Sequence, residues 1–139
     1  MYVACRDGTL TWAGSKDIFQ GLEDLHISSF ELQIPRDFGL NLKLNDEIKH
    51  LELTKTSDLK LFKEFLKDQQ TSVCALLLEN DFARDPLEEE VKYTVECCRI
   101  AESLGVGVVR INAVMKEKPN LSIREYVELS VKPIIEVLK

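Results

Sequence analysis

The sequence predicts an α/β fold in which four strands alternate with four helices. Short apolar runs alternate along the chain with segments whose apolar residues recur at helical spacing. The clearest unit runs from Thr71 to Val114, where an apolar run, an amphipathic segment and a second apolar run follow one another. Such alternation is typical of a parallel sheet with right-handed crossovers. We therefore expect one domain, residues 1–139, of the form (βα)4.

Composition and charge exclude several classes of protein. The chain has 139 residues, 45% of them hydrophobic and 30% charged, which is ordinary for one soluble domain. Its net charge of -6 and the lack of a basic run argue against a nucleic-acid partner. No apolar run approaches the roughly 20 residues of a membrane span, and the start does not resemble a signal peptide. The four cysteines include no C-x-x-C pair. We therefore expect a cytoplasmic protein with reduced thiols and no membrane partner.

The first part of the chain contains two predicted strands and one helix. The predicted elements are a strand at 2–5, a polar loop at 6–14, a helix at 15–26 and a strand at 30–34. Ser15 is a favourable N-cap, and the apolar residues after it share one helical stripe. The second strand alternates apolar and polar residues and ends before Pro35. Residues 36–56 fit either short extended pieces or a 3₁₀ turn.

The second part begins with a helix that Ser57 caps and that ends near Gln70, followed by a strand at 73–78. Asp85 and Pro86 predict the start of the next helix, because aspartate is a good N-cap and proline suits the first helical position. Its predicted buried stripe comprises Leu87, Val91, Val95, Cys98 and Ala101 to Leu104. Gly105 is expected to end the helix in a left-handed conformation.

The last unit is a strand at 106–114 followed by a helix. Ser122 and Glu125 have the spacing of a capping box at the start of this helix. We expect its apolar residues to point inward: Ile123, Tyr126, Val127, Val131, Ile134, Ile135 and Leu138.

The strand pattern favours half of a closed barrel. Glu31 and Gln33 lie on one face of the second strand, and Arg110 and Asn112 lie on one face of the fourth, each opposite an apolar face. In a (β/α)8 barrel the apolar face meets the outer helices and the other face points into the barrel. Such a barrel needs about 250 residues, so this chain supplies four of eight units, with helices on the outer face.

Three segments carry a family resemblance: FELQIPRDF, SVCALLLENDFARD and AESLGVGVVRINA. They resemble the N-terminal half of the xylose isomerase-like TIM barrels, the sugar phosphate isomerase/epimerase group that includes the endonuclease IV branch. The resemblance implies a divalent metal (Mn, Mg, Co or Zn) in the full-length protein, held by two glutamates, an aspartate and a histidine. The two glutamates move a proton beside a carbonyl. These ligands come from the second half, so we expect neither metal ligands nor catalytic residues in this chain.

The candidate substrate residues follow the strands. We expect Arg110, Asn112, Glu79, Asn80, Trp12 and Arg6 to contact a sugar or sugar phosphate. Arginine binds anions through a bidentate fork, and an aromatic ring can cover a sugar face. The structural alternatives are a salt bridge from Arg110 to Glu79 or Glu31, and loop-capping bonds from Asn80 or Asp81 to their own backbone.

The remaining polar residues have plainer interpretations. Glu31 and Gln33 are expected to line the barrel interior, where Glu31 serves either as a general base or as the ion-pair partner of Arg110. His26 and His50 are expected at the surface, which disfavours the endonuclease branch because that branch needs metal-binding histidines at early strand ends.

The sequence therefore favours the N-terminal half of a metal-dependent sugar (phosphate) isomerase or epimerase that is inactive alone. One alternative is a non-catalytic half-barrel that forms a homodimer through its open strand edges. Two others are an endonuclease IV-like barrel fragment and an open flavodoxin-like domain, the latter opposed by the lack of a glycine-rich phosphate loop.

Overall fold

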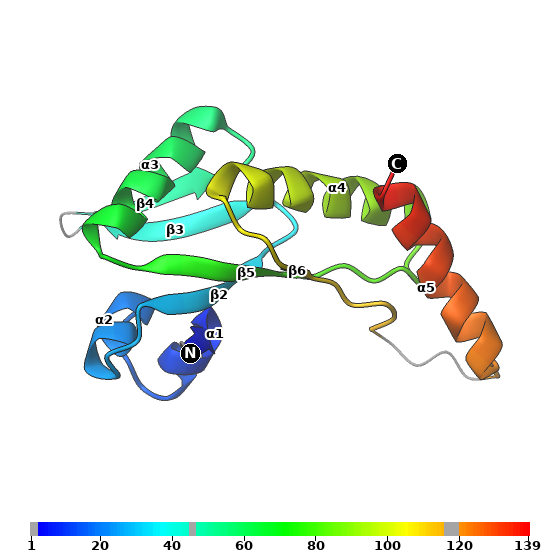
Figure 1. The fold of residues 1–139 in the computed structure, drawn as a ribbon, viewed down its shortest axis with the longest axis horizontal. Helices are drawn as coiled ribbons and strands as arrows, with labels where there is room; N and C mark the ends of the chain where they lie inside the picture. Colours follow the sequence, from blue (N-terminus) through cyan, green and yellow to red (C-terminus); the bar gives the residue numbers. More distant parts are fainter. Residues whose placement is uncertain (1–2, 45–46, 116–119) are drawn as a thin grey trace.

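The computed structural model describes residues 3–44, 47–115 and 120–139, and within them the chain is an α/β protein (Figure 1). A parallel sheet contains β1 (Ala4–Arg6), β2 (Ser29–Ile34), β5 (Ser72–Leu78) and β6 (Val109–Arg110). Its strands lie in the order β1-β2-β5-β6, so their spatial order follows the chain. The predicted α/β class and the four-stranded parallel sheet are confirmed.

The two faces of this sheet differ in burial. Phe30, Leu32 and Ile34 of β2 are buried, and the latter two lie in register with the buried Leu76 and Leu78 of β5. Because side chains alternate along a strand, Glu31 and Gln33 lie on the opposite face, which is only partly buried. One face is therefore packed against other elements, and the other carries polar side chains.

Helices and a hairpin form the packed side. Phe19 of α2 (Ile18–Asp24) stands edge-on to Phe30 and to Phe65 of α3 (Thr56–Asp68), with ring centroids 5.9 and 4.8 Å apart. Helix α4 (Leu87–Leu104) runs along β5 on the side that also carries α3 (Figure 1). The core thus lies between these elements and the apolar face of the sheet.

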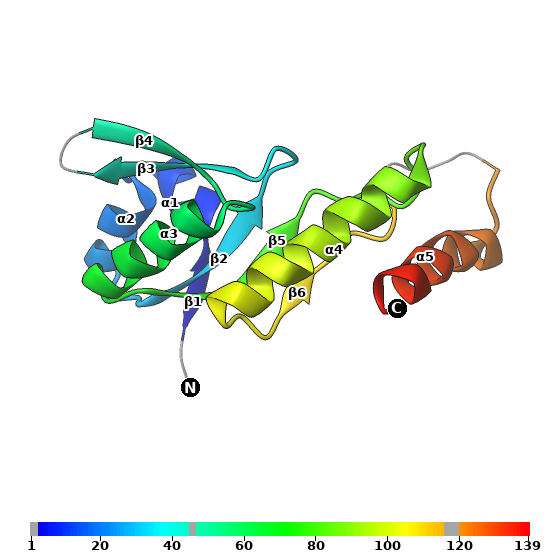
Figure 2. The same ribbon diagram turned by 90° about the horizontal axis from the view of Figure 1, so that it is seen from above.

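Within residues 36–56, β3 (Gly39–Leu44) and β4 (Glu47–Glu52) form a second, antiparallel sheet. The hypothesis of a 3₁₀ turn is wrong, and that of extended pieces is confirmed. Leu42 and Leu51 are buried, because the hairpin turns its leucines toward the core while α3 packs against β4 (Figure 2). Alternating leucines in this stretch were the signal for a strand pair.

Three predicted boundaries near the N-terminus are wrong. Residues 6–14 are not a simple loop but contain α1 (Asp7–Trp12), whose Leu10 is buried. The next helix starts at Ile18 rather than Ser15, because Asp17 is the residue whose side chain accepts the Gln20 N–H. The first strand, predicted at 2–5, comprises Ala4–Arg6, and Tyr2 of the predicted range lies outside the described part of the chain.

The caps of α3 and α4 also differ from prediction. Ser57 lies inside α3, and the N-cap is Lys55, which makes no side-chain cap bond. Pro86 keeps an extended backbone and precedes the first turn of α4, so Asp85 is not its N-cap. Gly105 ends α4 with φ of 73°, as predicted.

The buried face of α4 is rotated from the predicted stripe. Its buried residues are Glu90, Tyr93, Thr94, Cys97, Ile100 and Ala101. Leu87 is exposed instead. Polar groups occupy the inner face because the strand ends supply their hydrogen-bond partners. The spacing of apolar residues in the sequence does not reveal such partners.

The last unit departs most from prediction. Only Val109 and Arg110 of the expected strand 106–114 pair with β5. The segment continues beyond them, and the Phe82 N–H donates to the Ala113 carbonyl at 3.1 Å.

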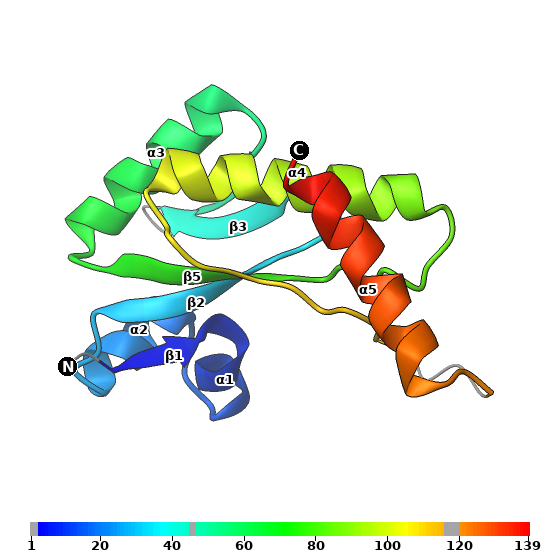
Figure 3. The same cartoon turned by 45° about the vertical axis from the view of Figure 1, so that its right-hand side comes forward.

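The capping box of Ser122 and Glu125 is confirmed at the start of α5 (Ile123–Val137). The helix packs against the side of α4 and extends beyond the sheet (Figure 3).

Several apolar residues predicted to point inward from α5 are exposed. They are Ile123, Val127, Val131, Ile135 and Leu138. The prediction failed because the described chain offers α5 only the flank of α4, so one side of the helix has nothing to cover it.

Two further observations concern the whole described chain. Its four cysteines are free, and Cys97 is fully buried. No helix among the described residues is long and apolar enough to cross a membrane.

Candidate functional site

A chain of hydrogen bonds joins β1, β2 and β5 near their carboxyl ends. The Arg6 guanidinium donates to the side-chain oxygen of Gln33, and the side-chain nitrogen of Gln33 donates to the Glu79 carboxylate. The Asp7 carboxylate anchors this network, because it accepts the backbone N–H of Gln33 at 2.7 Å. The network presents cation, amide and carboxylate side by side, which together can donate to and accept from the hydroxyls of a polyol.

Arg110 and Glu31 form an ion pair across the same face of the sheet. The two residues stand on β6 and β2, on either side of β5, and both are partly exposed. Of the two predicted partners of Arg110, the structure thus pairs it with Glu31, while Glu79 bonds to Gln33. The face thus carries one ion pair, while the charge of Glu79 is hydrogen-bonded to the neutral amide of Gln33.

Asn80 and Asn112 use their side chains to join the ends of β5 and the segment after β6. The Asn80 amide donates to the Asn112 carbonyl at 2.6 Å, and the Asn112 backbone N–H returns a bond of 2.8 Å to Asn80. The Asn112 amide donates to the Leu78 carbonyl at 2.8 Å. These bonds replace sheet pairing where β6 stops, which favours a structural role for both asparagines.

Asp81 caps the loop that follows β5. Its carboxylate accepts the backbone N–H groups of Ala83 at 3.0 Å and Met115 at 3.2 Å. The same carboxylate oxygen thereby ties this loop to the segment after β6. This matches the structural alternative in which Asp81 bonds to nearby backbone.

Trp12 lies at the end of α1 with its side chain 80% exposed. The Arg6 guanidinium stands 5.9 Å from the centre of the indole ring, a weak cation–π contact. An exposed aromatic ring beside a polar network has the composition of a sugar-binding surface, where the ring covers apolar C–H groups and the polar groups bind hydroxyls.

The structure adds a cluster that the sequence did not predict. Glu90 of α4 is 1% exposed. Its carboxylate accepts hydrogen bonds from the Arg36 guanidinium at 2.5 Å and the Asp81 N–H at 2.8 Å, and it forms a second ion pair with the Arg84 guanidinium at 3.4 Å. Buried carboxylates are rare unless paired, and no pattern of apolar residues would have found this one. The glutamate holds the strand-end loops that carry the candidate site.

Tyr93 and Arg36 complete this clamp between α4 and the strands. The Tyr93 hydroxyl donates to the Ile34 carbonyl at 2.5 Å and accepts the Glu79 N–H at 3.0 Å. Arg36 stacks 4.5 Å from the Tyr93 ring centre and donates to the Glu79 carbonyl at 2.7 Å. Burial raises the pKa of the Tyr93 hydroxyl, so the neutral phenol is the form that bridges the two strands. The clamp fixes the backbone from which Glu79 extends.

The metal ligands implied by the resemblance find no counterpart in this part of the chain. No three His, Cys, Asp or Glu side chains among the described residues lie close enough to hold a metal ion. His26 and His50 are exposed, as predicted, and His50 is 2.9 Å from the Asn41 side chain. The resemblance places the ligands of that family in the second half of the barrel and not among these residues.

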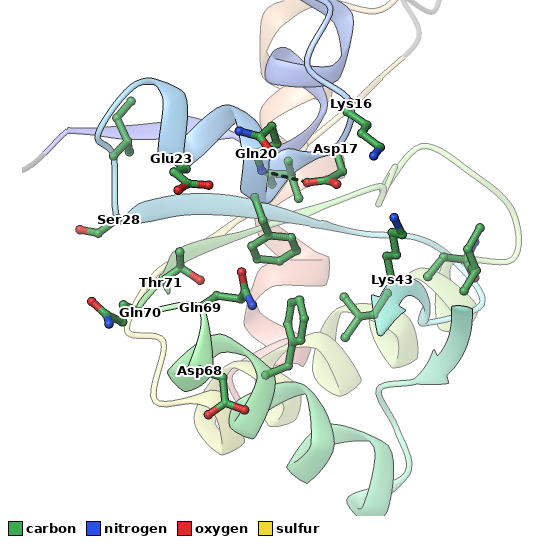
Figure 4. Close-up of a pocket in the computed structure, with 17 residues that line it drawn as sticks. Lys16, Asp17, Gln20, Glu23, Ser28, Lys43, Asp68, Gln69, Gln70 and Thr71 are labelled. Carbon is green, nitrogen blue, oxygen red and sulfur yellow. Dashed lines mark hydrogen bonds between the residues drawn. The ribbon is translucent and has the colours of Figure 1, made fainter. Parts of the chain in front are cut away.

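A cavity of about 740 Å³ lies away from the polar face of the sheet. It opens between α2, the end of α3 and the β3–β4 hairpin, with Lys16, Asp17 and Lys43 at one end and Glu23, Gln70 and Thr71 at the other (Figure 4). None of the predicted site residues lines it. The cavity and the polar groups at the strand ends are therefore separate places on the molecule, and the second is the site that the sequence predicted.

Comparisons with known proteins leave the family open. A scan against models of protein families and a search of curated proteins each found no match. The xylose isomerase-like resemblance remains a hypothesis, and the arrangement of strands and side chains is what supports a function.

Proposed function

We propose that this chain is the N-terminal half of a metal-dependent sugar or sugar phosphate isomerase or epimerase, and that it contributes substrate-side residues. The strand order supports the barrel. Parallel strands in chain order lack the reversal that marks an open, doubly wound sheet such as a flavodoxin-like one. A sheet that is apolar on its helix side and polar on the other is typical of a barrel wall.

The observation that carries the proposal is the network from Arg6 through Gln33 to Glu79. It lies near the carboxyl ends of three neighbouring strands, the end at which barrel enzymes place their active sites. Its groups donate and accept hydrogen bonds within a few ångströms of one another, as sugar hydroxyls require. Trp12 adds an exposed apolar surface beside Arg6.

In this proposal the chain binds and orients substrate and performs no proton transfer. Each charged group on the face already has a partner, Glu31 with Arg110 and Glu79 with Gln33. Carboxylates held in this way serve as hydrogen-bond acceptors. The proton-moving residues and the metal ligands would come from the other half of the barrel.

Tryptophan fluorescence tests the proposal, because Trp12 is the single tryptophan of the chain. Titration with ketoses and aldoses is expected to change the Trp12 emission with dissociation constants on the order of millimolar, as befits half of a site. Gln33→Leu should abolish the change, whereas Asn41→Leu, an exposed amide on β3, should preserve it. Sugars that leave the emission unaltered would contradict the proposed binding face.

Turnover gives a second readout. Purified chain supplied with Mn²⁺ and a keto-sugar is expected to show no isomerisation. Sustained, metal-dependent turnover would show that the chain holds its own proton-moving groups, contrary to the proposal.

A further inference from the structure

The cavity of about 740 Å³ lies between two helices of this chain. Its walls are α2 and the end of α3, with the β3–β4 hairpin beside them (Figure 4). These elements stand on the packed side of the parallel sheet, whereas the other half of a barrel would meet the polar face and the two open strand edges. The other half therefore does not account for this cavity. Its volume is within the range of small-molecule sites, roughly 300 to 1,000 Å³.

Apolar side chains form part of the cavity wall. Phe19 of α2 and Phe65 of α3 meet there edge-on, with ring centroids 4.8 Å apart. Ile18, Ile27 and Leu42 line the same cavity. Both aromatic rings are only partly buried, so they present apolar surface to a ligand.

Charges of opposite sign stand at the two ends of the cavity. Lys16 and Lys43 extend toward each other at one end, and Glu23 lies at the other (Figure 4). Neither Lys16 nor Glu23 forms an ion pair with another described residue. Asp17 is also at the lysine end, but its carboxylate is the N-cap of α2 and accepts the Gln20 N–H at 2.9 Å. A ligand that complements both ends carries an anion and a cation separated by an uncharged body.

Amide side chains stand between these two ends. Gln69, just after α3, extends its amide into the cavity (Figure 4), and this amide forms no hydrogen bond with another described residue. Gln20 also lines the cavity, and its side-chain nitrogen donates to Asp24 at 2.9 Å. A primary amide both donates and accepts, so it can pair with a peptide group. A purely hydrocarbon body would leave such amides without partners.

We propose that this cavity binds a short peptide with free ends. Its carboxyl end lies between Lys16 and Lys43, and its amino end lies beside Glu23. Its apolar side chain contacts the rings of Phe19 and Phe65, and its backbone amides bond to Gln69. A peptide combines the features that the cavity complements: opposite charges at two ends, an apolar side chain and amide groups between them.

Calorimetric titration at pH 7 tests the proposal with alanyl-phenylalanyl-alanine. The expected dissociation constant is on the order of 100 µM. Acetylation of the amino end and amidation of the carboxyl end each remove one charge, and each should weaken binding roughly 5-fold, as the loss of an exposed charge pair does. No binding of the free tripeptide at millimolar concentration would overturn the proposal. So would a loss on amidation alone, because the cavity would then be a site for organic anions.

The compound 8-aminooctanoate tests the part played by the amides and the side chain. It places the same number of bonds between ammonium and carboxylate as a tripeptide does, but has only methylene groups between them. It should bind more than ~10-fold more weakly than the tripeptide. Equal affinity would show that the cavity selects separated charges rather than a peptide.

Two variants place the peptide in this cavity. Lys16→Gln should weaken the free tripeptide roughly 5-fold and leave the affinity of the amidated form unchanged, because that form has no carboxylate. Glu23→Gln should behave in the same way toward the free and the acetylated forms. The controls are Lys49→Gln and Glu89→Gln, since both residues are exposed and neither lines the cavity.

Circular dichroism checks that the four variants keep their secondary structure. Equal weakening by a variant and its control, or equal weakening of free and end-blocked peptides, would overturn the proposed position of the peptide.

Peptide binding is independent of the sugar chemistry proposed above, because none of the predicted substrate residues lines this cavity. A chain that binds the tripeptide but keeps its Trp12 emission unchanged in the presence of sugars would refute the proposed function alone. A chain that responds to sugars and does not bind the tripeptide would refute this proposal alone.

Discussion

Glu90 and Arg36 form an ion pair with 2.5 Å between their charged atoms, and Glu90 is 1% exposed. The pair joins the first turns of α4 to the loop after β2. Arg36 also donates to the Glu79 carbonyl, so the ion pair reaches the residue at the centre of the candidate site. Replacing Glu90 would therefore also leave the Asp81 N–H without its hydrogen-bond acceptor.

Glu90→Ala should lower the free energy of unfolding by roughly 3 kcal/mol, because it removes one partner of a buried ion pair and leaves the surrounding donors without an acceptor. Urea unfolding followed by circular dichroism measures the loss. Glu89→Ala is the matched control, since Glu89 is an exposed glutamate in the same helical turn. It should change stability by less than about 0.5 kcal/mol. Equal effects of the two substitutions would show that the buried ion pair does not contribute to the free energy of unfolding.

Tyr93→Phe should destabilise the chain by about 1 to 3 kcal/mol, because it leaves the Ile34 carbonyl and the Glu79 N–H without their hydroxyl partner. It should also change the response to alkali. Burial raises the pKa of the folded-state Tyr93 above its ordinary value near 10. The unfolded chain therefore loses this proton first, and the stability contributed by the neutral phenol is lost as the pH rises above about 10.

Urea unfolding at pH 8 and pH 11 separates this effect from the rest of the chain. The loss of stability between these two values should be smaller in Tyr93→Phe than in the unmodified chain. An identical loss in both would mean that Tyr93 does not contribute to alkaline unfolding.

Local sequence signals predicted the parts of the fold that depend on local chemistry. The apolar run at 73–78, the left-handed Gly105 and the capping box at Ser122 all agree with the structure. In each case the residues that determine the conformation lie within a few positions of one another. Chain order and alternation then sufficed to predict a parallel four-stranded sheet.

The remainder depends on contacts between distant residues. Glu90 is buried because Arg36, 54 positions away, provides a charge partner, and no spacing in the sequence indicates that meeting. Helix α5 shows the opposite case, since its apolar residues were predicted to point inward but several of them are exposed, because the described chain packs only α4 against the helix. In the candidate site, the sequence named Arg6, Gln33 and Glu79 but not the bonds that link them.

Cys97 should be the least reactive thiol of the chain. Burial raises the pKa of its thiol to about 12, and the side chain is fully buried. At pH 8 the reactive thiolate is therefore scarce, and alkylation by iodoacetamide should be more than ~100-fold slower in the folded chain than in urea. Mass spectrometry of the peptides measures each site.

Cys98 is the internal control for this measurement, because it is adjacent in sequence and only partly buried. Burial raises the pKa of its thiol as well. It should nevertheless react before Cys97 in the folded chain and at a similar rate in urea. Simultaneous modification of both in the folded state would mean that this face of α4 opens readily.

Ser122→Ala should weaken the start of α5 by about 1 kcal/mol of helix stability, because the Ser122 hydroxyl accepts the Glu125 N–H in the capping box. Hydrogen bonds from Ser122 lower the pKa of the Glu125 carboxyl. The ionised carboxylate therefore stabilises the folded helix above its ordinary pKa near 4.3, and this contribution is lost as the pH falls through the lower folded value. Helical ellipticity should fall on acidification, and less in Ser122→Ala than in the unmodified chain. Ser130→Ala, the same change in the middle of α5, should preserve both the helix and its acid response, since alanine has the highest helix propensity.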